Sequence, residues 1–389
     1  MHECKGNLRA YTWNKIKGME QKILTADNNF YQFDNYICNH NMKNVIVICG
    51  KSFEKFTISK HLKDLSEDNI VNITFFNDFK PNPDYDSVVK GVQAFRNNNC
   101  DSIIAVGGGS AMDVAKCVKL FANMPENTNY LEQEIVPNNI PFVALPTTAG
   151  TGSEATRFAV IYHNGEKQSI AHESCIPSAV LFDTTVLETL PDYQRKATML
   201  DAFCHAIESF WSVNSTEESK DYSRSAIQLI LANYEAYLRN EPDGNSNMLL
   251  AANIAGKAIN ITQTTAGHAM CYKLTSLYGI AHGHAAALCV SVLWPYMIGH
   301  TNLCIDSRGQ EYLDKVFLEL AYVMGENSPF DGFNKFNNVL NTLCLEKPQI
   351  KDNDYEVLTK SVNPVRLKNN PIALDKAIID FLYHRMMEK

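Results

Sequence analysis

The sequence has 389 residues, of which 45% are hydrophobic and 20% are charged, so it is long enough for two packed domains and its composition excludes a disordered or fibrous chain. Asp and Glu (43) outnumber Lys and Arg (35), which gives a formal net charge of −8. With this acidic balance and no dense run of basic residues, we expect a small-molecule partner and no nucleic acid.

The cysteines and the apolar segments indicate where the protein resides. The 11 cysteines are scattered and never spaced as CxxC, which is typical of reduced thiols in the cytosol. The first residues lack the apolar core of a secretion signal, and the longest apolar stretch, residues 285–299, is too short to span a bilayer. We therefore expect a soluble, cytoplasmic protein that does not enter the membrane.

The first half of the chain alternates short apolar runs with helix-like segments. Residues 1–29 are polar and lack a clear period, so we treat them as an N-terminal extension. Over residues 30–186 the pattern predicts an α/β domain with a parallel sheet and crossover helices. The predicted strands include residues 45–49, 73–77, 102–106 and 142–146.

The second half has a different periodicity. Long segments with a 3.6-residue repeat, at 193–213, 221–239 and 248–261, replace the strand-like runs. A turn signal near residues 184–190 separates the two halves. We predict an all-helical domain over residues 187–389.

A glycine turn follows the predicted strand at 102–106. Three glycines and a serine, at 107–110, lead into a helix-like segment. Glycines let the backbone approach an anion closely, and the free N–H groups of a helix start suit a pyrophosphate. The fingerprint GxGxxG is not met, because Met112 stands at the third glycine position. An ordinary turn between a strand and a helix is the alternative.

A second polar loop follows the predicted strand at 142–146. Its sequence, TTAGTGSE at 147–154, offers four small hydroxyl residues and two glycines. Ligands of open α/β sheets bind at the carboxyl ends of strands, so this loop is suited to phosphate and ribose. A helix cap at Thr151 or Ser153 is the plainer interpretation. Two such loops after two strands favour a bound ligand.

A carboxylate and three histidines in the helical half are suited to a metal ion. Asp201 and His205 are four residues apart and so share one face of a helix. His268 and His282 lie 14 residues apart, with Gly279 between them to divide them onto two elements. One oxygen and three nitrogens suit Fe(II) or Zn(II). Any one of these histidines could be an ordinary core or surface residue, so the interpretation depends on the four together.

Such an ion beside a nicotinamide would act as a Lewis acid. It would polarise a carbonyl so that hydride from the reduced ring can reach the carbonyl carbon. This is the chemistry of an alcohol dehydrogenase.

Several long motifs, in one order, resemble those of the iron-containing (group III) alcohol dehydrogenases over residues 30–385. They are GGGSAMDVAK, PTTAGTGSE, DAFCHAIE and the segment that runs from HAM to AHGHA. The resemblance implies a dinucleotide-binding α/β domain and an all-helical metal-binding domain, the architecture shared with dehydroquinate synthase, with the site in the cleft between them. It also implies a homodimer in which an N-terminal edge strand, which we place at residues 30–40, pairs across the two-fold axis.

The resemblance assigns roles position by position. The metal ligands it implies are Asp201, His205, His268 and His282, of which the last two are also catalytic. The cofactor contacts it implies are Gly108, Gly109 and Ser110 for the pyrophosphate, with Asp113, Thr147, Thr148, Thr151 and Lys167 around them. Lys167 alone would be an ordinary solvated charge.

Two departures from the family pattern concern the proton and the cofactor. Many members carry a second histidine where this chain has Tyr272, so Tyr272, His284 or a water chain remain as proton routes, although a tyrosine of ordinary pKa is a poor acid. After the first strand, NAD-preferring relatives often place a carboxylate, and here the residues are Gly50, Lys51 and Ser52. We therefore expect NADP to be accepted beside NAD, with a preference that leans toward NADP, unless Lys51 points into solvent.

A third departure concerns the substrate. The segment before His268 carries donors where relatives that reduce plain aldehydes are glycine-rich and apolar. Arg157, Lys257 and Lys273 could add cations that bind an anionic aldehyde, or could be ordinary surface charges. The sequence from 257 to 289 resembles the branch of the family that reduces phosphonoacetaldehyde to 2-hydroxyethylphosphonate in phosphonate biosynthesis.

Other functions remain open. The runner-up is a short-chain alcohol or lactaldehyde dehydrogenase with an uncharged substrate. A metal-free cyclase or lyase of a related fold, or a non-catalytic dinucleotide-binding protein, belongs to a different class; the intact aspartate and three histidines argue against both.

Overall fold

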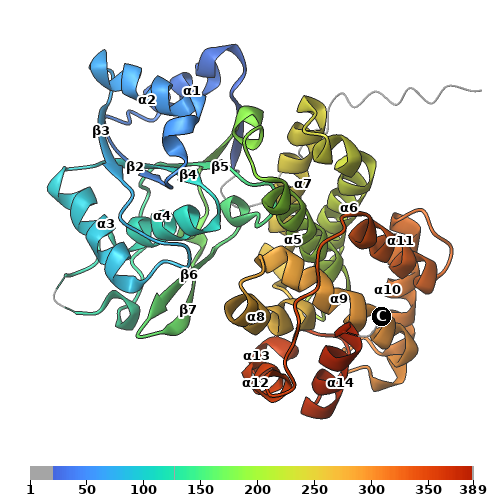
Figure 1. Cartoon of the computed structure of the whole chain (residues 1–389). Helices are drawn as coiled ribbons and strands as arrows, with labels where there is room; N and C mark the ends of the chain where they lie inside the picture. Colours follow the sequence, from blue (N-terminus) through green and yellow to red (C-terminus); the bar gives the residue numbers. More distant parts are fainter. Residues whose placement is uncertain (1–20, 127, 388–389) are drawn as a thin grey trace, which may run out of the picture.

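The computed structural model describes residues 21–126 and 128–387 and divides them between a layered α/β part and a helical part (Figure 1). The α/β part contains a six-stranded, all-parallel sheet in the order β1-β8-β5-β4-β2-β3 and a separate antiparallel hairpin of β6 and β7. The predicted fold class is confirmed: a parallel sheet is followed by a domain of helices.

The strands alternate with helices along the first half of the chain. The strands are β1 (Lys22–Thr25), β2 (Asn44–Cys49), β3 (Asn72–Phe76), β4 (Ser102–Gly107), β5 (Phe142–Pro146), β6 (Phe158–His163), β7 (Glu166–Ala171) and β8 (Ala179–Phe182). The helices between them are α1 (Asp27–Asn39), α2 (Thr57–Glu67), α3 (Tyr85–Asn97) and α4 (Gly109–Phe121). A 3-10 turn at Thr184–Leu187 leads into the second half.

The sheet is covered on both faces, which explains why its strands are apolar throughout. In β2, Val45 and Val47 belong to the core on the side of α1 and α2, whereas Ile46 and Ile48 belong to the core on the side of α3 and α4. Successive side chains of a strand point to opposite faces, so a strand buried on both sides needs an unbroken apolar run.

The N-terminal region differs from the prediction. β1 lies inside the segment treated as an extension, and it forms the edge of the sheet through parallel pairing with β8. Residues 30–40, expected to supply an edge strand, lie largely in helix α1, where Phe33 and Tyr36 are buried under the sheet. That placement was wrong, because the apolar residues of this segment are spaced three apart, as on one helix face.

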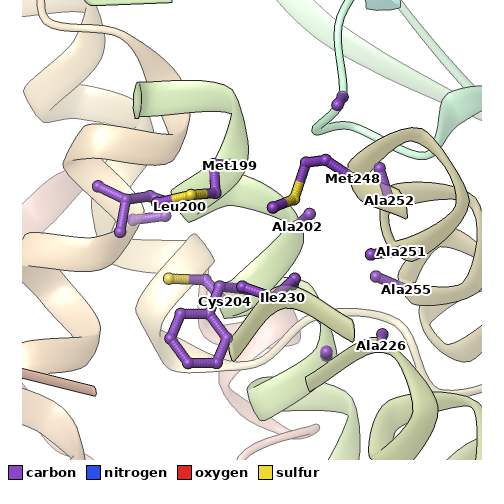
Figure 2. Packing of buried hydrophobic residues seen from close by; sticks show 14 of the residues in the cluster. Met199, Leu200, Ala202, Cys204, Ala226, Ile230, Met248, Ala251, Ala252 and Ala255 are labelled. Atoms are coloured by element: carbon purple, nitrogen blue, oxygen red, sulfur yellow. The ribbon is translucent and has the colours of Figure 1, made fainter. Parts of the chain in front are cut away.

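The helical part is built around α5 and its neighbours. The helices are α5 (Asp192–Trp211), α6 (Glu217–Leu238), α7 (Pro242–Thr262), α8 (Ala266–Tyr278), α9 (His282–Gly299), α10 (Gln310–Val323), α11 (Pro329–Thr342), α12 (Asp354–Ser361), α13 (Pro364–Leu367) and α14 (Lys376–Met387). Figure 2 shows the buried packing of α5, α6 and α7, in which small side chains such as Ala202, Ala226 and Ala251 let the helices approach closely.

The two parts meet through glycines. A Cβ atom added at Gly152, in the loop after β5, would lie 2.6 Å from Cα of Gly256 on α7. A Cβ atom added at Gly150, in the same loop, would lie 2.6 Å from the carbonyl oxygen of Thr198 on α5. The loop after β5 therefore packs backbone to backbone on the helices of the second part, which only glycine permits at these contacts.

This contact predicts the effect of one methyl group. Gly256→Ala should lower the free energy of unfolding by about 1–3 kcal/mol, because the new Cβ would lie 2.9 Å from Cα of Gly152 and the backbone must shift. Gly299→Ala, at a helical position with open space around it, is the matched control and should leave the stability unchanged or slightly raised. Thermal denaturation of the two variants measures the difference; equal midpoints would contradict the close contact.

Candidate active site

One face of α5 carries three polar side chains in an otherwise apolar interior. Asp201, His205 and Glu208 follow one another at intervals of four and three residues, which places them on one side of the helix. Their side chains are 4%, 8% and 0% exposed, respectively. Buried charges of this kind are tolerated only with partners.

The partner for both carboxylates is His268, in the first turn of α8. Its Nε2 lies 3.4 Å from Oδ1 of Asp201, and its Nδ1 forms a short hydrogen bond with Glu208. Gly267 permits this approach, since a Cβ there would lie 2.6 Å from Oε1 of Glu208. The rings of His205 and His268 stack with their centroids 4.5 Å apart.

Glu208 fixes the orientation of His268. Its carboxylate also accepts a hydrogen bond from Oγ1 of Thr265 at 2.7 Å, and Nε1 of Trp211 donates to that Oγ1 at 3.0 Å. With Nδ1–H directed at Glu208, the lone pair of Nε2 is directed toward Asp201. This is the carboxylate–histidine arrangement that orients metal-ligating imidazoles. Sequence analysis did not single out Glu208, although its position seven residues, or two helical turns, after Asp201 places it on the same face of the helix.

The charges of the cluster suit a cation. Although burial opposes it, the neighbouring histidines hold the pKa of Asp201 below its ordinary value, so the carboxylate is ionised. Burial lowers the pKa of His205 and of His282 to about 4, so both are neutral at pH 7 and have free lone pairs. Burial lowers the pKa of His268, but Glu208 and Asp201 raise it to about 9, so Nε2 of His268 would release its proton when a metal binds there.

The ligand atoms of Asp201, His205 and His268 lie within 4.8 Å of one another, which fits a divalent metal ion. His282 lies beside this group at the start of α9, with its ring centroid 5.4 Å from that of His268 and its Nδ1 3.5 Å from Sγ of Cys271. The structure therefore brings together all four predicted residues, three of them closely. Oxygen and neutral nitrogen donors are the set that Fe(II) or Zn(II) accepts.

The two polar loops of the α/β part face each other. They follow β4 and β5, which are neighbours in the sheet. A Cβ added at Gly108 would lie 3.4 Å from Oγ1 of Thr148, and one at Gly109 would lie 3.4 Å from Cγ2 of Thr151. Gly108 is the N-cap of α4 and, being glycine, offers no side-chain cap to the helix start. The N–H groups of Gly109 and Ser110, at the beginning of the helix, are suited to an anion.

The position of these loops in the sheet also favours a ligand. The chain leaves β2 through α2 on one face, and it leaves the adjacent β4 through α4 on the other. Open α/β sheets bind ligands at such a switch point, outside the carboxyl ends of the strands. Gly50, Lys51 and Ser52 lie there after β2, with the N–H of Gly50 bonded to the carbonyl oxygen of Val106 at 3.3 Å and Lys51 exposed.

The other residues predicted to contact the cofactor lie in or beside these loops. Thr147 is buried and its N–H donates to the carbonyl oxygen of Gly107 at 3.0 Å, while Oγ of Ser110 accepts from the N–H of Asn82 at 3.2 Å. Asp113 is half-buried on α4, burial raises its pKa to about 6, and Oγ of Ser153 lies 3.5 Å from its carboxylate.

Lys116, which sequence analysis did not single out, is a buried support for the second loop. Its Nζ donates to Oγ of Ser153 and to Oγ1 of Thr156, both at 3.1 Å, and to the carbonyl oxygen of Phe158 at 2.6 Å. Because Ser153 belongs to the loop after β5, these hydrogen bonds hold that loop against α4.

Lys167 and Tyr272 meet beside His282. Lys167 extends from β7, and its Nζ lies 3.5 Å from the centroid of the Tyr272 ring, which stacks on His282 at 5.2 Å. Burial raises the pKa of Tyr272 above its ordinary value, so the phenol is a weaker acid here than in water. His284, the alternative proton route, is bonded through Nδ1 to the hydroxyl of Tyr193 at 3.2 Å.

That Arg157, Lys257 and Lys273 contact the substrate stays a prediction. Arg157 pairs with Glu173 at 3.2 Å and stacks over Phe158. Lys257 is on α7, where its charge acts on the buried Glu154. Lys273 is five residues after His268 on α8, which directs it about 140° around the helix axis from that ligand.

Comparison with known proteins agrees with this geometry. The chain matches two family descriptions, "Iron-containing alcohol dehydrogenase" over residues 20–184 and "Fe-containing alcohol dehydrogenase family, C-terminal" over residues 196–387. Together these matches cover most of the sequence. The protein belongs to the iron-containing alcohol dehydrogenase family and is an oxidoreductase of that type.

Two relatives of similar sequence identity are matched over different shares of their own length. A phosphonoacetaldehyde reductase of Streptomyces viridochromogenes is 31% identical over 308 residues, which cover 75% of this chain and 77% of that protein. Aldehyde-alcohol dehydrogenase 2 of Entamoeba histolytica is 31% identical over 291 residues, covering 69% of this chain and 33% of that protein. This chain thus spans about a third of the length of the Entamoeba relative.

Solved structures share the fold over nearly the whole chain. An iron-containing alcohol dehydrogenase of Thermotoga maritima superposes with a TM-score of 0.79 at 26% identity, covering 95% of this chain and 98% of the other. A sulfoacetaldehyde reductase of Bifidobacterium kashiwanohense in complex with NAD+ gives a TM-score of 0.82 at 23% identity, covering 94% and 96%. The latter likeness is one of fold. Within the described residues, no helix is both long enough and apolar enough to cross a membrane.

The hydrogen bond between Glu208 and His268 predicts a change in metal affinity. Glu208→Gln should weaken Fe(II) or Zn(II) binding by about 10- to 100-fold, because the imidazole loses the carboxylate that orients it. Asp192→Asn, at an exposed position on the same helix, is the control and should bind metal as the wild type does. Titration of the metal-free proteins with metal measures the difference; equal affinities would show that Glu208 does not support the site.

Proposed function

We propose that this protein reduces phosphonoacetaldehyde to 2-hydroxyethylphosphonate with NADPH or NADH. The observation that carries the proposal is the buried group of Asp201, His205 and His268, with His282 beside it, at the meeting point of a helical domain and a sheet with two facing glycine and threonine loops. The similarity to a phosphonoacetaldehyde reductase over three-quarters of both chains supports this substrate.

The bound groups and the protein have separate tasks in this reaction. When bound, a divalent metal supplies a Lewis acid for the carbonyl and the reduced nicotinamide supplies hydride. Asp201, His205, His268 and His282 would hold the metal. The N–H groups at Gly109 and Ser110, with the hydroxyls of Thr148 and Thr151, would hold the cofactor phosphates and ribose.

The protein also determines which side chains carry protons. Glu208 keeps the proton of His268 on Nδ1 and so leaves Nε2 free as a donor atom. Tyr272 holds its proton tightly, since burial raises its pKa, and its hydroxyl already accepts a hydrogen bond from Arg366 at 3.0 Å. The alcohol oxygen would then receive its proton from a chain of water molecules or from His284.

The substrate assignment can be tested by comparing aldehydes. Enzyme loaded anaerobically with Fe(II) should show kcat/KM at least about 100-fold higher for phosphonoacetaldehyde than for propionaldehyde, because unpaired cations penalise a neutral substrate. Oxidation of NADPH or NADH is followed at constant metal content. Equal values would instead indicate a short-chain alcohol or lactaldehyde dehydrogenase. His268→Ala should lose metal and turnover with either aldehyde.

The residues after β2 predict the cofactor preference. Gly50, Lys51 and Ser52 supply no carboxylate to repel a 2′-phosphate, and the exposed lysine can pair with one. Lys51→Ala should raise KM for NADPH about tenfold and leave KM for NADH unchanged. Lys55→Ala, a nearby exposed lysine, is the control. Equal effects on both cofactors, or none, would show that Lys51 does not bind the 2′-phosphate.

The assembly and the location also remain proposals. A homodimer would bury the outer side of β1, the strand at the edge of the sheet. Sedimentation as a monomer would contradict it. A cytoplasmic location agrees with the cysteines, which are all unpaired among the described residues.

A further inference from the structure

Two cations from distant parts of the chain meet over one aromatic ring. Lys167 reaches the Tyr272 ring from β7, and Arg366 reaches it from α13, with Cζ 5.0 Å from the ring centroid and Nη1 donating to the phenol oxygen at 3.0 Å. In Figure 1 the hairpin of β6 and β7 lies on the side of the α/β part nearest to α8 and α13. The cluster therefore spans the two halves of the molecule.

Neither cation has a carboxylate at salt-bridge distance. Among residues 21–126 and 128–387, no salt bridge involves Lys167 or Arg366, although the charge of Asp113 acts on Lys167. Lys220 and Arg308 are paired with carboxylates, Lys220 with Glu319 at 2.9 Å and Arg308 with Asp306 at 2.6 Å. The buried Lys116 and Arg195 are compensated instead by hydrogen bonds to several neutral oxygens. Lys167 and Arg366 share one neutral group, the Tyr272 ring and its hydroxyl.

This arrangement is unfavourable without an anion. Burial and the charge of Arg366 together lower the pKa of Lys167 to about 8. A partly buried charge costs free energy unless an opposite charge or hydrogen bonds compensate it. The guanidinium fork of Arg366 and the ammonium of Lys167 together suit a planar or tetrahedral oxyanion.

The cluster lies next to the reacting centre. Tyr272, beneath both cations, stacks on His282, whose ring is 5.4 Å from that of the metal-site residue His268. An anion bound by the cations would thus be one aromatic ring away from the metal ligands. We take the carbonyl end of a short anionic aldehyde to lie toward the metal ligands and its charged end toward the cations.

We infer that Arg366, together with Lys167, binds the anionic end of the aldehyde substrate. This inference rests on the proposed function and assigns charge recognition to residues other than Arg157, Lys257 and Lys273. The anion between Arg366 and Lys167 could belong either to the substrate or to a phosphate group of the cofactor. Because the family resemblance connects Lys167 with the cofactor ribose, the test is made on Arg366.

The first experiment compares charged and neutral aldehydes. In Fe(II)-loaded enzyme, Arg366→Gln should lower kcat/KM for phosphonoacetaldehyde and for sulfoacetaldehyde about 100-fold, with kcat/KM for propionaldehyde and KM for NADPH unchanged. Arg366→Lys, which keeps the charge without the fork, should recover part of the loss. Lys368→Gln removes an exposed cation two residues away and should behave as wild type. A rise in KM for NADPH with every aldehyde would assign the anion to the cofactor and overturn the inference.

The second experiment measures binding without turnover. Ethylphosphonate, which has the anion but no aldehyde, should bind the Fe(II)-loaded wild type in a calorimetric titration and bind Arg366→Gln at least about tenfold more weakly. Equal binding by the two proteins, or none by the wild type, would overturn the inference. A thermal denaturation midpoint equal to that of the wild type shows that the variant is folded. If the wild type does not prefer phosphonoacetaldehyde, the proposed function fails, while this titration still decides whether Arg366 binds an anion.

Discussion

The site depends on two carboxylates buried seven residues apart on one face of α5. Asp201 and Glu208 are almost fully excluded from water, so both need compensating partners inside the protein. His268 lies between them and contacts both, through Nε2 and Nδ1. A divalent cation among Asp201, His205 and His268 would add the positive charge that two buried carboxylates favour. The local charge therefore supports the proposed metal site.

The contact between the two halves connects this cluster to the loops after β4 and β5. Gly150, in the loop after β5, packs on Thr198, one helical turn before Asp201, and Gly152 packs on Gly256 of α7. The hydroxyls of that loop face Gly108 and Gly109 across the switch point of the sheet. A displacement of the loop would thus be transmitted to α5 over a single backbone contact. The same close packing of glycines therefore fixes the loop after β5 relative to the residues proposed to bind metal on α5.

The sequence predicted those strands and residue pairs whose structure depends only on residues close to them in the chain. β5 has the predicted bounds, Phe142–Pro146, because a strand buried on both faces is an unbroken apolar run. The pairing of Asp201 with His205 follows from helix geometry alone. The four-residue strand β1 carried too few residues for a period, and its strand character comes from pairing with β8. Arg366 could not be predicted, because it meets Tyr272 from 94 residues away through the fold.

The central claim is that the buried residues of α5, α8 and α9 form one metal site. The most direct measurement is anomalous diffraction from crystals grown with Fe(II) under anaerobic conditions. We predict one strong peak bonded to Asp201 and to the Nε2 atom of His268, with His205 and His282 completing the ligands. A peak elsewhere in the molecule, or none in crystals of protein that contains iron, would contradict this account of the site.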